Sequence, residues 1–311
     1  MTRPWRAYLE LMRLPAVFTV VADVMMGYLV THGDLEPPHV FALLVTASCC
    51  LYLAGMVLND VYDADVDARE RPERPIPSGR VTQDAACGLG WGLMAGGMSI
   101  ACLTSLYVDD WRPGFLGSLL TGSILLYDGV LNRTCLAPIV MGSCRTLNVL
   151  LGMSLVTNAR WPFESRNWTN SEWTIALGIG VYIAGVTWFA RGEARASQRL
   201  QLVWGIVVML SGLLMLETSG FMQLRPAHFV TEQGTWPMLW LGLALVILAR
   251  CLWAVWRLEP RAVQIAVRNS LRALIVIDAA IVLGSCGPAW GGAVLALLAP
   301  MLLLERWFST T

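Results

Sequence analysis

Three aspartates in the stretch 59–67, which directly follows a long apolar run, have a spacing that could support metal chemistry. Asp60, Asp63 and Asp67 are three and four residues apart, which on a helix places them on one face with Asn59 beside the first. Three carboxylates on one face repel one another unless a cation lies among them. Mg²⁺ prefers oxygen ligands and usually keeps phosphate oxygens in its shell. The spacing therefore predicts a Mg²⁺–phosphate platform at the end of a membrane helix. The alternative is a solvated acidic loop that balances nearby arginines.

The segment that follows, 71–80 (RPERPIPSGR), cannot continue as a helix, because it contains three prolines and a glycine. Arg74 and Arg80 are candidates for binding phosphate, because a guanidinium can hold phosphate oxygens in a bidentate fork. The alternative is that these arginines only mark the inner edge of the membrane, where arginine is common.

Arg145 lies within a later apolar run, with Asn148 one helical turn further on the same face. An arginine inside a span is costly unless it faces the bundle interior and has a partner. We expect Arg145 and Asn148 to line a polar cavity, with Arg145 among the catalytic candidates. A structural ion pair of Arg145 with Asp23 or Asp128 is the alternative.

Two more groups of polar residues follow apolar runs. Tyr127 and Arg133 lie at the inner end of the fourth run and are candidates for binding substrate. Arg191, Glu193 and Arg195 follow the sixth run. Arg191 and Arg195 are four residues apart, so they share a face if the helix continues, and we expect at least one to contact phosphate. Glu193 is a candidate metal ligand or orienting group, or it simply balances the two arginines.

The residue composition is that of a membrane protein. The chain has 311 residues, of which 56% are hydrophobic and 14% charged, with mean hydropathy +0.58. Soluble domains carry about 25% charged residues. The net charge of zero gives no indication of nucleic-acid binding, and three histidines and eight cysteines without a C-x-x-C pattern make a His- or Cys-based metal site improbable. We expect one membrane-embedded domain over 1–311, folded as an all-α transmembrane bundle.

A membrane span needs about 20 mostly apolar residues. Ten candidate spans are expected at 14–31, 38–58, 84–106, 113–131, 137–157, 173–190, 200–219, 236–256, 271–285 and 288–305. The last two are short and could be one broken helix, so nine or ten spans are predicted. Gln264, Arg268 and Asp278, in or before the ninth, are weaker candidates for lining the cavity.

The distribution of arginine predicts the orientation. With the N-terminus inside, most of the 22 basic residues, all of them arginine, fall in inner segments. This orientation brings the loops 59–83, 129–136 and 190–199 to one face. We expect a multi-pass protein of the bacterial inner membrane, with the N-terminus and the site facing the cytoplasm.

These motifs together resemble the UbiA superfamily of membrane-embedded prenyltransferases. Asn59-Asp60-x-x-Asp63-x-x-x-Asp67 matches the first Asp-rich motif of that family in full, and the segment 74–79 (RPIPSG) resembles the motif that follows it. The order of spans also fits, so the resemblance covers most of the chain. The blocks 127–148 and 264–278 look most like the EboC-like branch.

The resemblance implies Mg²⁺-assisted ionisation of an allylic prenyl diphosphate, whose carbocation alkylates a lipophilic, often aromatic, acceptor. The Asn59–Asp67 motif would then hold Mg²⁺ and diphosphate. One departure concerns the family's second motif, D-x-x-x-D, which here reads Arg191-Gly192-Glu193-Ala194-Arg195. Either these arginines replace the second metal, or the site holds one metal, or catalysis is lost and binding kept.

Other functions are less well supported by the sequence. A non-catalytic relative that binds or carries an isoprenoid or pigment precursor fits the altered second motif. A secondary transporter would favour an internal repeat and charges near mid-span, whereas here the charges gather at the inner face. A CDP-alcohol phosphotransferase would need a D-G-x-x-A-R pattern, which this chain lacks.

Overall fold

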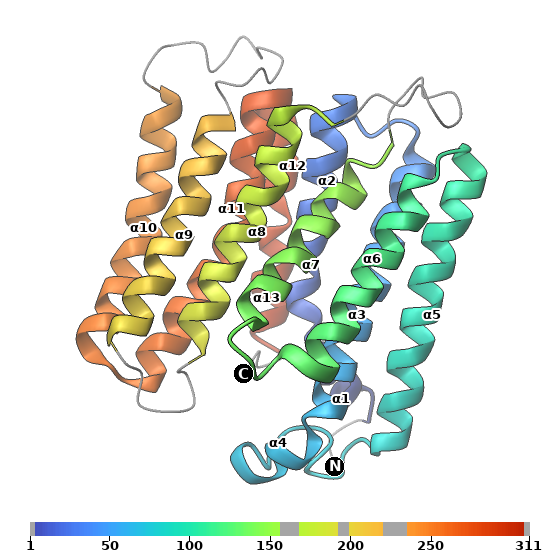
Figure 1. The fold of residues 1–311 in the computed structure, drawn as a ribbon, viewed down its shortest axis with the longest axis vertical. Coiled ribbons are helices and arrows are strands. Elements are labelled where there is room, and N and C mark those ends of the chain that lie inside the picture. The colour runs from blue at the N-terminus through green and yellow to red at the C-terminus, as the bar shows by residue number, and fades with distance from the viewer. Residues whose placement is uncertain (1–3, 156–167, 192–198, 220–234, 308–311) are drawn as a thin grey trace.

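The computed structural model describes residues 4–155, 168–191, 199–219 and 235–307, and this part of the chain is helical, with no strands (Figure 1). The helices, in chain order, are α1 (Pro4–Leu11), the 3₁₀ helix η1 (Leu14–Ala16), α2 (Val17–His32), α3 (Pro38–Tyr62), α4 (Ala64–Glu70), α5 (Gln83–Val108), α6 (Arg112–Leu126), the π-helix η2 (Tyr127–Leu131), α7 (Ala137–Gly152), α8 (Asn170–Ala190), α9 (Arg199–Ser219), α10 (Thr235–Arg257), α11 (Pro260–Cys286), α12 (Pro288–Ala296) and α13 (Leu298–Glu305). The predicted all-α transmembrane bundle is confirmed.

Prolines and side-chain caps set where many of these helices begin. Proline occupies the first turn of α3, α11 and α12, where its missing N–H costs no helical hydrogen bond. Thr82 caps α5 by accepting a hydrogen bond from the amide of Ala85. At the start of α8, Thr169 and Glu172 form a capping box, each accepting from the other's backbone amide. These local signals fix the ends of the long apolar runs.

The predicted number of nine or ten spans is not confirmed. Among the described residues, eight segments are long and apolar enough to cross a membrane. α7 is not among them because it has only 16 residues, although it lies within the bundle beside α2, α6 and α8. α11 is not among them either; it carries Arg261, Arg268, Arg272 and Asp278 along its 27 residues.

The C-terminal part differs from the sequence prediction. The loop expected over 257–270 is mostly helix, because α11 begins at Pro260 and continues unbroken to Cys286. The backbone then turns at Gly287, which has φ 92°, a conformation that favours glycine. α12 and α13 run back along α11, as the hydrogen bonds from Arg272 in the middle of α11 to Glu305 at the end of α13 show. The last two predicted spans are therefore two antiparallel elements and not one broken helix.

Glycines allow α7, α8 and α9 to pack closely. A Cβ atom on Gly142 of α7 would lie 2.5 Å from the carbonyl oxygen of Gly180 on α8. A Cβ atom on Gly185 of α8 would lie 2.4 Å from the amide nitrogen of Met209 on α9. Small residues at such contacts let membrane helices approach backbone to backbone. This packing fixes the position of α7, which carries Arg145.

Candidate active site

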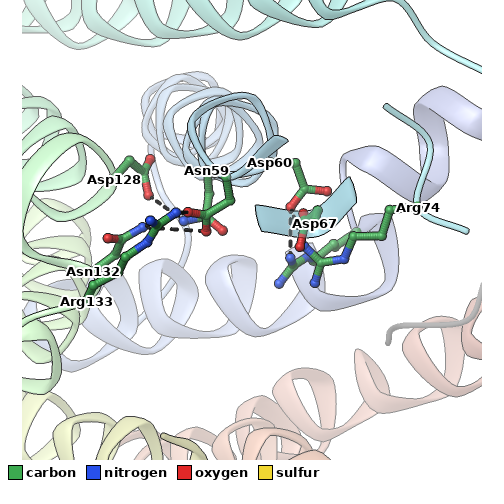
Figure 2. Close-up of polar contacts among 9 residues, drawn as sticks. Asn59, Asp60, Asp67, Arg74, Asp128, Asn132 and Arg133 are labelled. Atoms are coloured by element: carbon green, nitrogen blue, oxygen red, sulfur yellow. Dashed lines mark hydrogen bonds and ion pairs between the residues drawn. The ribbon is translucent and has the colours of Figure 1, made fainter. Parts of the chain in front are cut away.

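The Asp-rich stretch is not one continuous helix. α3 ends at Tyr62, α4 begins at Ala64, and Asp63 joins them with φ −92° and ψ 3°. The chain bends there, so the three aspartates do not share the single face that their spacing predicts. Figure 2 shows that the polar side chains of this region form two separate groups, one with Asp60, Asp67 and Arg74 and the other with Asn59, Asp128, Asn132 and Arg133.

The first group contains two buried aspartates held by arginine. The guanidinium of Arg74 lies 2.6 Å from Asp67 Oδ2 and 3.3 Å from Asp60 Oδ1 (Figure 2). Arg13, from the chain before α2, approaches the same oxygen of Asp60 at 3.0 Å. Charge-assisted hydrogen bonds of this kind are the strong ones. The two carboxylates are therefore neutralised by guanidinium groups that are themselves suited to phosphate.

The second group surrounds Asp63. The guanidinium of Arg133 lies 2.6 Å from Asp63 Oδ1, and the amide of Asn132 donates to the same oxygen at 3.3 Å. The amide of Asn59 donates to Asp128 Oδ1 at 3.2 Å. The hydrogen bond that Arg133 donates to Asp63 raises the pKa of the exposed Arg133 guanidinium.

Asp128 has an oxygen without a partner. It belongs to η2, and π-helical turns are frequent at functional sites. Its side chain is buried, and its Oδ2 atom has no hydrogen-bond partner among the described residues. A buried carboxylate oxygen left unpaired beside Asn59 is available to a cation or a donor from a ligand.

The side chains of this region fit Mg²⁺ in kind but are not gathered around one point. Among the described residues, no three Asp, Glu, His or Cys side chains lie close enough together to hold a metal ion. The donors themselves are the hard oxygen ligands that Mg²⁺ prefers: Asn59, Asp60, Asp63 and Asp67, with the free oxygen of Asp128 beside them. A bound Mg²⁺–diphosphate would have to displace arginines from these carboxylates.

A second polar cluster lies inside the bundle. Arg145 on α7 donates to Asp23 on α2 at 2.6 Å and to the hydroxyl of Thr19 at 2.8 Å. Asn148 donates to Asp23 at 3.1 Å and accepts a hydrogen bond from Ser48. Of the two partners anticipated for Arg145, the structure shows Asp23. Arg145 is paired with Asp23 and also lines the cavity, so the ion-pair and the cavity interpretations of this residue are compatible.

One large cavity, of about 780 Å³, is lined both by residues from the groups near Asp63 and by residues from the cluster of Arg145 inside the bundle. Its polar wall includes Arg13, Ser48, Tyr52, Glu70, Arg71, Glu73, Arg74, Tyr127, Asp128, Arg145 and Asn148. Asn59, Asp60, Asp63 and Asp67 are not among the lining residues. Its apolar wall is formed by α6, α7, α8, α11 and α13 through side chains such as Leu120, Met141, Ile183, Val186, Val267, Leu271 and Met301. Gln264 and Arg268 also line it, as predicted, whereas Asp278 is fully buried outside the lining. The cavity can hold an acidic head and an apolar chain at once.

Four of the expected site residues lie elsewhere or outside the described part. Arg80 does not line the cavity but forms a bidentate pair with Glu10 at 2.6 and 3.0 Å, and that pairing raises its pKa. Arg191 is exposed and donates to the carbonyl oxygen of Thr134 at 2.7 Å, which places it beside the loop that carries Arg133. Glu193 and Arg195 lie outside the residues that the structure describes.

Sequence analysis missed two contributors. It gave no site role to Arg13, although Arg13 binds Asp60. It gave no role to Asn132, which binds Asp63. Arg13 directly precedes the first apolar run, and that position is the only sequence signal that pointed to it.

A profile of the UbiA prenyltransferase family matches residues 20–275, which is most of the chain. The chain belongs to the UbiA prenyltransferase family. The family suggested by the Asp-rich motif is therefore confirmed, while the EboC-like branch stays a prediction.

Relatives of this UbiA-family chain include two named digeranylgeranylglyceryl phosphate synthase. That of Methanopyrus kandleri is 37% identical over 134 residues, 39% of this chain and 48% of the relative. That of Methanocaldococcus jannaschii is 25% identical over 197 residues, 56% of this chain and 67% of the relative. The chain thus spans about half the length of the first of these relatives.

Solved structures of UbiA-family proteins share the fold. A UbiA homologue from Archaeoglobus fulgidus, solved bound to GPP and Mg²⁺, has a TM-score of 0.65 at 14% identity and covers 93% of this chain and 99% of its own. A digeranylgeranylglyceryl phosphate synthase has a TM-score of 0.61 at 16% identity and covers 92% and 99%. The similarity extends over nearly the whole bundle, and the chain is an integral multi-pass membrane protein.

Proposed function

We propose that this chain is a Mg²⁺-dependent prenyltransferase, which transfers the prenyl group of an allylic prenyl diphosphate to a lipophilic acceptor in the membrane. The observation that carries the proposal is one cavity that has an apolar wall and is also lined by Arg13 and Arg74, the two arginines that hold Asp60 and Asp67 of the motif. Membership of the UbiA prenyltransferase family supports it.

The Asp-rich residues would hold the metal and the arginines the diphosphate. Asn59, Asp60, Asp63 and Asp67 supply oxygen ligands, and the bound Mg²⁺ would neutralise charge that builds up on the leaving diphosphate. Arg74 and Arg13, which hold Asp60 in this structure, are placed to transfer their hydrogen bonds to diphosphate oxygens. Exchanging one anion for another keeps each guanidinium paired.

The cavity wall then governs the fate of the prenyl group. The bond between the prenyl carbon C1 and the diphosphate oxygen breaks, and the electron pair leaves with the diphosphate. The aromatic faces of Tyr52 and Tyr127 line the cavity, and such faces attract positive charge. The apolar side chains of α8, α11 and α13 exclude water that would quench the cation. A bond to the acceptor then forms and the acceptor loses a proton.

We propose a lipophilic acceptor and do not restrict it to aromatic compounds. The product in the name of the curated relatives, digeranylgeranylglyceryl phosphate, carries prenyl chains on a glyceryl phosphate. That name supports a non-aromatic acceptor.

The experiment that tests the proposal measures diphosphate release. Purified full-length protein is incubated with prenyl diphosphates of several lengths and with candidate acceptors, with and without Mg²⁺. We expect pyrophosphate and a prenylated product only in the presence of Mg²⁺. Binding of prenyl diphosphate without any release would support the second candidate, a non-catalytic isoprenoid carrier. The sequence Arg191–Arg195 in place of a second Asp-rich motif favours that candidate.

We also propose that the site faces the cytoplasm from the bacterial inner membrane, as the arginine distribution indicates. Glu73 lies in the loop after α4 and at the cavity. In a variant without the exposed Cys102 and Cys135, a Glu73→Cys residue should react with an impermeant thiol reagent only after the inner face is opened. Reaction in intact cells would reverse the orientation.

A further inference from the structure

Arg268 on α11 is a cation without a partner inside the cavity. Its side chain is half-buried and lines the cavity, and it forms no ion pair or hydrogen bond with any described residue. Of the other guanidinium groups of the wall, Arg74 is engaged with Asp67 and Arg145 with Asp23, whereas the side chain of Arg71, in the loop after α4, also has no ion pair or hydrogen bond to a described residue. Charged groups in membrane helices normally pair or line the path of a substrate.

Neither of the other two arginines of α11 is an unpaired charge in the cavity. Arg272, one turn further, is bonded to Glu305 of α13. Arg261, two turns earlier, is exposed and does not line the cavity. Of these three, only Arg268 presents an unpaired positive charge to the interior.

The neighbours of Arg268 on α11 suit an amphiphile. Gln264 lies one turn before it and Leu271 one turn after it, on the same face, and all three line the cavity. Gln264 also has no hydrogen bond to a described residue, so its amide can donate to an anion. Val267 and Leu271 of α11 and Met301 of α13 extend the apolar surface beside the charge.

This group lies on a different wall from the acidic residues. α11 packs against α2, α8, α10 and α12, whereas the aspartates belong to α3, α4 and η2. Arg268 therefore reaches the cavity from a helix to which none of the motif aspartates belongs.

We propose that Gln264 and Arg268 form the binding site for the acidic head group of the acceptor, which is an anionic amphiphile with a phosphate monoester or carboxylate. This inference rests on the proposed prenyl transfer and names the class of its second substrate. Leu271, Val267 and Met301 hold the apolar part of the acceptor next to the prenyl chain.

The test measures direct binding to the full-length protein in nanodiscs. The probes are a dodecylglyceryl phosphate, the matched uncharged dodecylglycerol, inorganic phosphate, and geranylgeranyl diphosphate with Mg²⁺. Arg268→Gln should weaken binding of dodecylglyceryl phosphate about ten- to hundredfold, as expected for loss of one charge-assisted hydrogen-bonding group. Binding of dodecylglycerol and of geranylgeranyl diphosphate should not change.

Matched variants make each outcome decisive. Arg261→Gln removes an arginine from the same helix outside the cavity and should leave all four probes unaffected. Arg268→Lys keeps the charge but loses the guanidinium fork, and should lie between wild type and Arg268→Gln; it replaces that variant if the latter does not fold. Gln264→Leu should weaken the binding of dodecylglyceryl phosphate severalfold.

Three results would overturn the proposal. Arg268→Gln could weaken the binding of geranylgeranyl diphosphate and leave the binding of dodecylglyceryl phosphate unchanged, which would make Arg268 a diphosphate ligand. Dodecylglyceryl phosphate could bind no more tightly than dodecylglycerol. Inorganic phosphate could bind as tightly as dodecylglyceryl phosphate. Binding of geranylgeranyl diphosphate is measured separately. If the wild type shows no Mg²⁺-dependent binding of this probe, the result counts against the proposed transferase and not against this site.

Discussion

The guanidinium of Arg74 lies 2.6 Å from the carboxylate of Asp67, and both side chains are buried. The same guanidinium also reaches Asp60. In this arrangement a protein cation occupies carboxylates that the motif would otherwise offer to a metal. Metal binding and arginine pairing therefore compete for the same oxygens.

This competition predicts opposite effects of one substitution on two ligands. Arg74→Gln frees Asp67 and leaves Asp60 with Arg13 alone. Mn²⁺ alone, measured by electron paramagnetic resonance as a substitute for Mg²⁺, should therefore bind more tightly than to the wild type. Prenyl diphosphate with Mg²⁺ should bind about ten- to hundredfold more weakly, because a charge-assisted hydrogen bond to diphosphate is lost. Arg80→Gln is the control, since Arg80 pairs with Glu10 away from the cavity. Weaker Mn²⁺ binding in Arg74→Gln would contradict the competition.

A second prediction separates the aspartates of the motif. Asp63 receives hydrogen bonds from Arg133 and Asn132, whereas Asp65 is exposed and takes no part in these contacts. Asp63→Ala should abolish Mg²⁺-dependent binding of prenyl diphosphate, and Asp65→Ala should leave it within about twofold, because surface substitutions away from specific contacts change little. Isothermal titration calorimetry compares the two. Similar losses in both variants would mean that the overall acidity of the loop matters and not its specific ligands.

The sequence predicted the helices well because long apolar runs between prolines, glycines and capping residues have few other options in a membrane. It did not predict the bend at Asp63, since no proline or glycine lies between Asn59 and Asp67 to indicate one. It also predicted too short a ninth helix, because the charges of α11 suggested a loop where the structure shows a cavity-lining face.

The pairing of charged side chains was harder to predict than the helices. Asp23 was anticipated as a possible partner of Arg145, because a buried arginine needs a carboxylate and few are available within apolar runs. The contact of Arg13 with Asp60 joins residues 47 positions apart, and neither periodicity nor motif spacing specifies such a contact. Tertiary packing decides these partners.

A third prediction concerns the region in place of the second Asp-rich motif. Arg191 lies beside the loop that carries Arg133, which holds Asp63. If the arginines there balance the charge of the diphosphate, Arg191→Gln with Arg195→Gln should weaken its binding about ten- to hundredfold. The melting temperature should not change, because Arg191 is exposed. Arg257→Gln, an exposed arginine of α10 paired with Glu259, is the control. Unchanged affinity in the double variant would leave these arginines as topology signals only.

The last prediction concerns the buried pair of Arg145 and Asp23. Asp23 is fully buried, and Arg145 is its only cationic partner among the described residues. Replacing one member of a buried ion pair leaves an uncompensated charge, at a cost of about 3–5 kcal/mol. Arg145→Met should therefore lower the melting temperature in detergent strongly.

A second substitution tests whether that loss arises from the charge or from packing. Asp23→Asn in the Arg145→Met background removes the orphaned charge and keeps an amide that can bond with Asn148, which contacts Asp23 in the wild type. The double variant should regain much of the lost stability, since replacing both members of a buried pair is often nearly neutral. Its prenyl transfer should nevertheless stay low, because Arg145 also lines the cavity. Additive losses of stability in the double variant would show that Arg145 acts through packing and not through its charge on Asp23.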